Sequence, residues 1–351
     1  METVYNRLCT SIDEICAAHP CVSAVPFGRS YLGRTIPALQ LGGGGHRLLY
    51  LGGMTGSVRT AALLLRFVRD YAAAVQGGRR VAGIDISYLR NTRSITVVPL
   101  LNVDGAVLRC DGTDAENPLL ERLSMMCSLP TPDPGEVCCA SSDSANPFAG
   151  WVCNGRGVDL RRNFDASFAE AMASAGGIGG PGYPGMHPES EPECAAAASF
   201  LRGAATTDLT LHFLDAADER TDAGRISWYG ADHRTRSIAQ ILARDIDGKG
   251  YETASSGITC STASAGSIGE WYRTRHSGPL LEITLPVSGI REVPRGEDAA
   301  SMSGDAGDAA DHSCHALLDA ASQNPGDTLA NAALTLQYGK IRKLLFHGAV
   351  L

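Results

Sequence analysis

The sequence predicts a single α/β domain, with a mixed, mostly parallel, twisted β-sheet covered by helices on both faces. Short runs of apolar residues, typical of strands buried on both faces, alternate along the chain with longer segments of helical periodicity. Hydrophobic residues make up 44% and charged residues 19% of the 351 residues, which is enough apolar material for a large core. No internal repeat or break in composition divides the chain, so we expect one domain over residues 1–351.

The first hundred residues contain two predicted helices, a hairpin and two strands. Val4, Leu8, Ile12 and Ile15 follow helical spacing and define the first helix, and a run of glycines and arginines indicates the hairpin. In sequence order we expect a helix over 1–20, a hairpin over 28–36, a strand over 47–51, a helix over 59–75 and a strand over 94–101.

The remainder of the chain repeats this alternation but includes two segments of unusual composition. Residues 110–150, rich in Pro, Ser, Asp and Cys, are predicted as loops, and residues 296–327, rich in Ala, Asp, Ser and Gly, as a flexible low-complexity insertion. The other predicted elements are a helix over 191–201, strands over 209–214 and 225–229, a helix over 235–246, a strand over 280–285 and a C-terminal helix over 328–346.

Charge and cysteine content narrow the classes of partner and compartment. The net charge of −8 argues against a nucleic-acid partner, and no apolar run approaches the ~20 residues of a membrane helix. The first residues have no basic segment followed by an apolar run, so no secretory signal is visible. We therefore expect a cytoplasmic protein whose eleven cysteines are reduced.

Five short motifs occur in a fixed order between about residues 25 and 290. They are Gly28-Arg29-Ser30 with Gly33-Arg34-Thr35-Ile36, Pro99-Leu100-Leu101-Asn102-Val103-Asp104-Gly105, Asn154-Gly155-Arg156-Gly157-Val158-Asp159-Leu160-Arg161-Arg162-Asn163-Phe164-Asp165, Ser190-Glu191-Pro192-Glu193, and Leu211-His212. In this order they resemble the N-terminal hairpin, the P-x-x-N-P-D-G turn, the N-x-R-G-V-D-L-N-R-N-F-D segment, the S-E-P-E helix start and the second zinc-ligand strand of zinc carboxypeptidases. The chain is thus similar to the metallocarboxypeptidase A-like family, and the resemblance implies a zinc-carboxypeptidase-like fold.

The zinc-binding residues that this resemblance implies are mostly replaced. The family carries H-x-x-E after a strand, usually within G-G-x-H-G-x-E, and here Thr55 and Val58 occupy those two ligand positions. His212 matches the second histidine ligand, and Thr284 stands at the position of the general base. Valine has no lone pair and a neutral threonine hydroxyl is a poor zinc ligand, so the sequence predicts a degenerate member of the family.

Two residues leave an alternative open at this site. Glu282 lies two positions before Thr284 on the same strand face, about 6.6 Å away, so it would act as the base only if the strand register were shifted. His212 is the residual metal ligand by resemblance, but a lone histidine in an apolar strand is also a common hydrogen-bonded core residue.

Three arginines are candidates for binding a substrate carboxylate. By resemblance, Arg162 matches the family arginine that binds a terminal carboxylate, Arg161 replaces its asparagine, and Arg156 matches an upstream basic position. Planar guanidinium groups suit carboxylates, so the three can form an anion pocket. They can instead face solvent or pair with Asp159 and Asp165.

A second possible metal cluster, His312-Ser313-Cys314-His315, lies inside the predicted insertion. Short His/Cys clusters of this kind bind metal adventitiously more often than by design. No cysteine comes with a recognisable histidine partner, so a thiol nucleophile is not indicated.

Three functions are consistent with these observations. The first is a catalytically inactive pseudo-peptidase without a cofactor, which keeps a cleft for a peptide or cell-wall peptide with a free carboxylate. The second is an active zinc carboxypeptidase with an unorthodox metal site, which includes His212 and Glu282. The third is a structural or partner-binding protein with a vestigial cleft. Replacement of both residues of the H-x-x-E pair together with the base favours the first.

Overall fold

The computed structural model describes the chain with several gaps. The described residues are 2–112, 146, 148–180, 182–203, 207–215, 225–229, 233–244, 252–255, 265–275, 278–285, 290–293, 310–322 and 329–351. Most of the predicted loop over 110–150 lies outside these residues.

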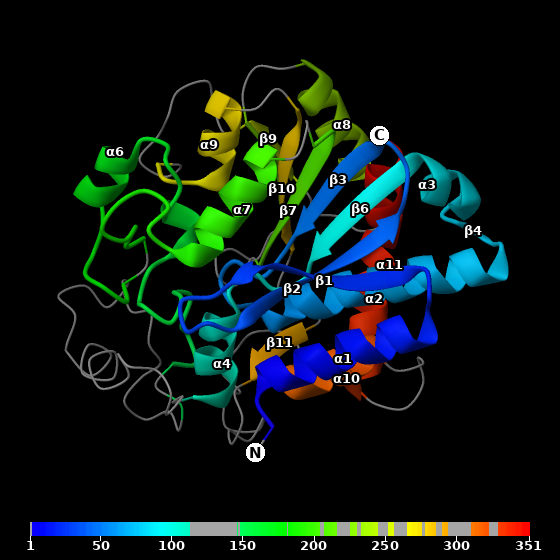
Figure 1. Ribbon diagram of the computed structural model, residues 1–351, viewed down its shortest axis with the longest axis horizontal. Coiled ribbons are helices and arrows are strands. Elements are labelled where there is room, and N and C mark those ends of the chain that lie inside the picture. Colours follow the sequence, from blue (N-terminus) through cyan, green and yellow to red (C-terminus); the bar gives the residue numbers. More distant parts are fainter. Residues whose placement is uncertain are drawn as a thin grey trace.

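An eight-stranded mixed sheet forms the centre of the described part, in the spatial order β1-β2-β6-β3-β7-β10-β8-β9 (Figure 1). The four central strands β6, β3, β7 and β10 are mutually parallel. Towards one edge β2 runs antiparallel to β6 and β1 antiparallel to β2, and towards the other β8 runs antiparallel to β10 while β9 is parallel to β8. The strands are β1 (Val22–Arg29), β2 (Thr35–Gly42), β3 (His46–Leu51), β6 (Arg93–Val98), β7 (Leu209–Asp215), β8 (Arg225–Trp228), β9 (Glu252–Ser255) and β10 (Leu280–Leu285). Two small sheets pair β4 (Arg80–Val81) with β5 (Ile84–Asp85), and β11 (Ile290–Val293) with β12 (Ala310–Ser313).

Helices cover both faces of the sheet. Helices α1, α2, α10 and α11 lie together on one side, and α7 and α9 lie on the other (Figure 1). The helices are α1 (Val4–Ala18), α2 (Val58–Gly77), α3 (Ile86–Thr92), α4 (Val103–Asp111), the 3₁₀ helix η1 (Leu160–Arg162), α6 (Phe168–Ala173), α7 (Pro192–Gly203), α8 (His233–Arg244), α9 (Ile268–Arg275), α10 (Cys314–Ser322) and α11 (Leu329–Gly348). The predicted fold class is confirmed.

Strand alternation decides which side chains meet each helical layer. Tyr50 of β3 points towards α2 and α11, where its ring lies 5.3 Å from that of Phe67 and its hydroxyl donates to the Leu345 carbonyl. Neighbouring strand residues point to the opposite layer, as the twofold periodicity of a strand requires. His212 belongs to this second set, because it pairs in register with Leu51 of β3.

Local chemistry at both ends explains the start and end of α2. The Ser57 side chain accepts a hydrogen bond from the Thr60 amide and caps the first turn. Gly78, at a φ of 56°, ends the helix in the left-handed conformation that glycine adopts without steric cost. The loop before Ser57 packs tightly, since a Cβ on Gly56 would lie 2.8 Å from the Ala106 amide of α4.

Part of the predicted flexible insertion is ordered, which corrects the prediction for residues 296–327. Residues 314–322 form α10, and Leu317 and Leu318 are fully buried in the core. The alanine-rich composition that suggested flexibility is also a strong helix-forming composition once two leucines can be buried. The rest of that segment lies outside the described residues, apart from the strand β12.

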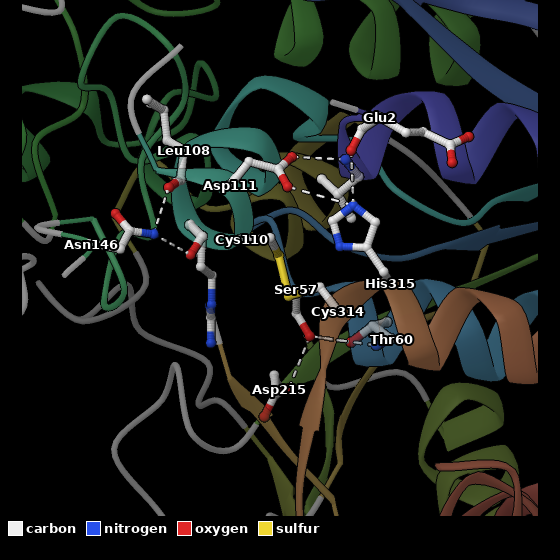
Figure 2. Close-up of a disulfide and its surroundings, with 12 residues drawn as sticks. Glu2, Ser57, Thr60, Leu108, Cys110, Asp111, Asn146, Asp215, Cys314 and His315 are labelled. Atoms are coloured by element: carbon white, nitrogen blue, oxygen red, sulfur yellow. Dashed lines mark hydrogen bonds and ion pairs between the residues drawn. A yellow bond between two sulfur atoms is a disulfide. The ribbon is translucent and has the colours of Figure 1, made fainter. Parts of the chain in front are cut away.

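A disulfide joins Cys110 of α4 to Cys314 of α10 across 204 residues of sequence (Figure 2). The expectation that all cysteines are reduced is therefore wrong for this pair. Both residues are buried, and Cys9, Cys16, Cys21, Cys153 and Cys194 are not disulfide-bonded. Within the described part of the chain, no helix has the length and apolarity needed to cross a bilayer.

Candidate functional site

The corner between β3 and α2 places Thr55 and Val58 in the interior. Thr55 is 2% exposed, and Val58, the first residue of α2, has no exposed surface. Val58 belongs to the hydrophobic core that continues along α2. An isopropyl group at this position offers neither a lone pair nor a charge, so the position cannot ligate a cation.

His212 lies beside Glu282 on the neighbouring strand. The two residues are direct register partners in the parallel pair β7 and β10, and His212 Nδ1 lies 3.2 Å from Glu282 Oε1. The Tyr229 hydroxyl donates to the other oxygen of the same carboxylate. His212 Nε2 is buried and has no hydrogen-bond partner among the described residues. The result is a buried chain of contacts from Tyr229 through Glu282 to His212.

Thr284 occupies the next position on this face of β10. It pairs with Leu214 and is 6% exposed. The strand register is regular, and Glu282 reaches His212 within it, so the contact does not need the register shift on which the sequence-based alternative depended. A threonine hydroxyl does not accept a proton near neutral pH, so Thr284 cannot act as a general base.

The three candidate arginines contact three different partners. Arg161 forms a forked ion pair with the buried Asp159, with nitrogen–oxygen distances of 2.9 and 2.8 Å, which is one of the pairings that the sequence left open. Arg162 donates to the Ala265 carbonyl at 3.1 Å, next to the N-terminus of α9. Arg156 lies 3.5 Å from Glu191 and 5.6 Å from the centre of the Tyr31 ring, with 36% of its side chain exposed. Among the three, the guanidinium of Arg161 is the one fully occupied by a carboxylate.

The Asp159–Arg161 pair has a clear electrostatic signature. Burial alone would raise the pKa of the Asp159 carboxyl, but the Arg161 guanidinium and the amides of Gly182 and Arg161 outweigh it. The pKa of Asp159 is therefore lowered. The pair fixes the 3₁₀ turn that presents Arg162, so Arg161 serves the shape of this loop.

The family model for zinc carboxypeptidases matches residues 8–288 of the chain. The chain belongs to the zinc carboxypeptidase family. This confirms the resemblance that the five motifs indicated.

Similar proteins include peptidases and solved carboxypeptidase structures. Gamma-D-glutamyl-L-diamino acid endopeptidase 1 of Lysinibacillus sphaericus is 25% identical over 286 residues, which are 81% of this chain and 66% of that protein. Uncharacterized protein YqgT of Bacillus subtilis is 28% identical over 194 residues, 53% of this chain and 46% of that protein. The chain thus spans less than two thirds of the length of these curated relatives.

Two solved structures show that the fold is shared. Bovine thrombin-activatable fibrinolysis inhibitor, in complex with tick carboxypeptidase inhibitor, has a TM-score of 0.57 and 16% identity, covering 95% of this chain and 97% of that one. Carboxypeptidase A from Helicoverpa armigera has a TM-score of 0.56 and 16% identity, and the match covers 96% of this chain and 71% of that one.

The zinc that the family name implies does not fit the described donors. A catalytic zinc needs three protein ligands and an open position for water. Val58 offers none, and the described residues contain no group of three His, Cys, Asp or Glu side chains able to hold a metal ion. The site of this zinc carboxypeptidase homologue supplies one imidazole, which already contacts Glu282, in place of a full ligand set.

The second candidate metal cluster loses one of its possible ligands to the disulfide. Cys314 is bonded to Cys110 and has no thiolate to offer. His315 of α10 directs Nε2 towards the Glu2 carbonyl, at 3.3 Å, and towards Asp111 at the end of α4, at 3.5 Å (Figure 2). The side chain of His312 lies outside the described part of the structure.

The family motifs meet in a buried polar cluster that sequence reasoning missed. The Asn154 amide donates to Glu191 at 2.8 Å and to Glu193 at 3.3 Å, and Glu193 also accepts from the Tyr31 amide. The Asp104 carboxylate accepts hydrogen bonds from the Ser30 hydroxyl, the Leu32 backbone amide and the Arg34 side chain, all in the same hairpin. The signal was available, since four motifs each carry at least one polar residue that would be costly to bury alone.

Tyr229 and Asp215 are further residues that the sequence did not single out. Tyr229 directly follows β8, and only the antiparallel pairing of β8 with β10 brings it to Glu282. Asp215 ends β7, three residues after His212, and accepts a hydrogen bond from Ser57 (Figure 2) and another from Arg59. The sequence signal for Asp215 is its position as a charged residue at the end of a mostly apolar strand.

Proposed function

We propose that this chain is a peptide-binding zinc carboxypeptidase homologue that has lost hydrolysis. The observation that carries the proposal is Val58, which is fully buried in apolar surroundings where the family has a carboxylate ligand. No rotation of a valine side chain provides a ligand, so the change cannot be offset locally. Without an activated water, peptide hydrolysis lacks its nucleophile.

The lack of a proton acceptor supports the same proposal. The base position is Thr284, and the nearby carboxylate of Glu282 is engaged by both Tyr229 and His212. A general base must be within hydrogen-bonding distance of the proton that it removes. Glu282 instead makes a buried contact that orders the strand ends.

The proposed ligand is a peptide with a free carboxylate, of the kind found in bacterial cell walls. Arg162 keeps the family's carboxylate-binding position, and the partly exposed Arg156 provides a second guanidinium. The relative from Lysinibacillus sphaericus is named for a γ-D-glutamyl-L-diamino acid peptide bond. A peptide of this chemistry carries the carboxylates that two guanidinium groups recognise.

The contact between His212 and Glu282 favours an alternative, an unorthodox zinc site built on this pair. Imidazole and carboxylate are both zinc ligands, but a third ligand would have to come from outside the described residues. In the remaining alternative, a structural or partner-binding protein, the cleft binds neither peptide nor metal.

Zinc stoichiometry is the test of lost hydrolysis. The full chain is purified without a metal-affinity column from zinc-supplemented medium, and its zinc is measured by plasma mass spectrometry. We expect far less than one zinc per chain. A value near one that falls on His212→Ala substitution would reject the proposal and support the alternative site.

Peptide titration tests the retained cleft. We expect γ-D-glutamyl-L-lysine to bind, and Arg162→Met to weaken binding about tenfold through loss of a charge-assisted hydrogen bond. Arg80→Met, an exposed arginine on β4, is the matched control. Equal binding by the wild type and Arg162→Met would show that Arg162 does not hold the peptide, and no binding at all would favour a vestigial cleft.

A cytoplasmic location is also part of this proposal, although the disulfide argues against it. Stable disulfides are uncommon in reducing compartments. Counting free thiols in protein alkylated during cell lysis distinguishes a cytoplasmic location from an oxidising compartment. Eleven free thiols support the cytoplasm, and a loss of the Cys110 and Cys314 thiols supports an oxidising compartment.

A further inference from the structure

A cavity of about 550 Å³ lies on the same sheet face as His212 but at the opposite ends of the strands. Arg47 and Ser94 are register partners at the start of β3 and β6, whereas Leu51 and His212 are partners at the end of β3. These positions differ by even numbers of residues along each strand, so they share a face. The cavity is therefore separate from the candidate site around His212.

The wall of the cavity is apolar and its floor is polar. Helix α7 contributes Phe200, whose ring centre lies 5.2 Å from that of Phe27 on β1. On the sheet, the Thr96 hydroxyl donates to the Gln40 side-chain oxygen at 3.1 Å. Arg47 and Thr207 also line the cavity.

The polar lining is rich in hydrogen-bond donors. Gln40 uses its oxygen towards Thr96, so its amide group keeps two donors. The Thr207 hydroxyl is buried, at 1% residue exposure, and has no partner among the described residues. Such a group costs free energy unless a ligand or water satisfies it.

The rim of the cavity carries a positive charge. The Arg47 side chain is exposed and forms no hydrogen bond or ion pair with the part of the chain that the structure describes. No aspartate or glutamate is among the described lining residues. The nearby Asp208 carboxylate lies outside this lining, where it accepts from the Arg47 backbone amide at 2.8 Å and lies 3.6 Å from His46. A donor-rich lining with one guanidinium and no carboxylate of its own favours a ligand that is anionic and rich in acceptors.

We propose that this cavity binds a small amphipathic aromatic carboxylate. The carboxylate pairs with Arg47, the aromatic body packs against Phe27 and Phe200, and the floor donors Gln40 and Thr207 satisfy further acceptor atoms. The volume lies within the roughly 300–1,000 Å³ range of small-molecule sites. Since the site shares no residue with Arg156, Arg162 or His212, it binds whether or not the cleft binds peptide.

Calorimetric titration of the full chain with 1-naphthylacetate tests the proposal. We expect one site per chain. Arg47→Met and the neutral analogue 1-naphthylacetamide each weaken binding about tenfold, because each removes the charge-assisted pair. Arg47→Lys restores part of the loss. Arg80→Met, which removes an exposed arginine from β4 rather than from the cavity, leaves affinity unchanged.

A second variant tests the cavity itself. Ser199 is exposed on α7 and lines the cavity, so Ser199→Trp fills the space without disturbing the core, and we expect no detectable binding. Circular dichroism confirms that the variants are folded. The proposal is overturned if the wild-type protein does not bind 1-naphthylacetate, or if Arg47→Met and Ser199→Trp bind it with the same affinity as the wild type.

Discussion

Arg59 and Asp215 form an ion pair that is almost completely buried beside the β3–α2 corner. Arg59 Nε donates to the carboxylate at 2.9 Å, its terminal nitrogen donates to the Leu285 carbonyl at 3.1 Å, and Ser57 donates to Asp215 at 2.9 Å. The pair thus ties the start of α2 to the ends of β7 and β10. A buried pair of this kind is costly to break, because removal of one partner leaves the other charge uncompensated.

Arg59→Met is therefore expected to lower the free energy of unfolding by about 3–5 kcal/mol. Replacing both partners, Arg59→Met with Asp215→Leu, recovers most of the loss, because no buried charge remains. Urea denaturation measures both effects, and the exposed Arg79→Met is the control. A single-variant cost below about 1 kcal/mol, the range of surface pairs, would contradict this burial.

Glu193 predicts how stability depends on pH. Burial raises the pKa of its carboxyl to about 8, and the nearby Asp104 and Glu191 add to the effect, while the Tyr31 amide opposes it. The folded protein thus prefers the protonated form. The stability that this group provides is complete below about pH 4.5, its unfolded value, and is lost as the pH rises through 8.

Between pH 6 and 8 this loss amounts to about 2 kcal/mol, from about 1.4 kcal/mol per pH unit for one proton. Glu193→Gln should remove this component, because glutamine keeps the oxygen that accepts from Tyr31 but does not ionise. Thermal denaturation across this range measures the slope, with the exposed Glu14→Gln as control. An unchanged slope in Glu193→Gln would show that another group is responsible.

At the scale of elements, α10 connects the N-terminal and central parts of the fold. It packs against α1, α2 and α11, and the disulfide joins it to α4, which directly follows the Asn102 turn (Figure 2). Ser57 and Thr60, at the start of α2, lie close to the bridge in the same view. The bridge thus supports the helices that surround the candidate site.

Loss of this bridge is expected to lower stability by about 2–5 kcal/mol, since it closes a long loop in the unfolded chain. Chemical denaturation of the wild type with and without dithiothreitol measures the effect, and Cys110→Ser with Cys314→Ser should match the reduced wild type. The double variant itself should not respond to the reductant. If reduction leaves the wild-type midpoint unchanged, the two sulfurs are not joined in solution.

The elements that the sequence predicted well are those whose local pattern agrees with their burial. The β7 and β10 strands are buried on both faces over their whole length and β3 over its last four residues, and the predicted bounds of all three differ from the structure by at most one residue at either end. Helix α9 and the disulfide were missed, because their stabilising contacts come from residues distant in sequence. The sequence grouped His212 with Glu282 only as possible ligands of an unorthodox metal site, and it did not predict their direct contact, which depends on how β7 pairs with β10.

The assignment of the corner residues to the family's ligand positions rests on a motif and stays a prediction. Thr55 and Val58 follow β3 at the spacing of the family's H-x-x-E pair, so their chemistry was readable from sequence alone. Their burial was not, since it depends on α4 approaching Gly56. The partners of Arg156, Arg161 and Arg162 likewise depend on loop geometry that no spacing rule provides.

At the scale of the whole molecule, the fold keeps the scaffold on which a zinc site is built. Strands β3, β7 and β10 are parallel neighbours, and by the resemblance in motifs residues 55, 58, 212 and 284 stand at the family's ligand and base positions. A scaffold held by a large core tolerates changes at a few site positions, at a cost of about 1–3 kcal/mol for added bulk. Restoring the missing donors should then restore the metal.

We expect the triple variant Thr55→His, Val58→Glu and Thr284→Glu to bind about one zinc per chain, through its new ligands and His212. Mass spectrometry of the metal content and a zinc-dependent rise in melting temperature, by the linkage of binding to folding, measure this. The matched control replaces the same three positions with alanine, and adding His212→Ala to the triple variant should abolish binding. A folded triple variant without zinc would mean that His212 and Glu282 are held too firmly by each other for the scaffold to serve as a metal site.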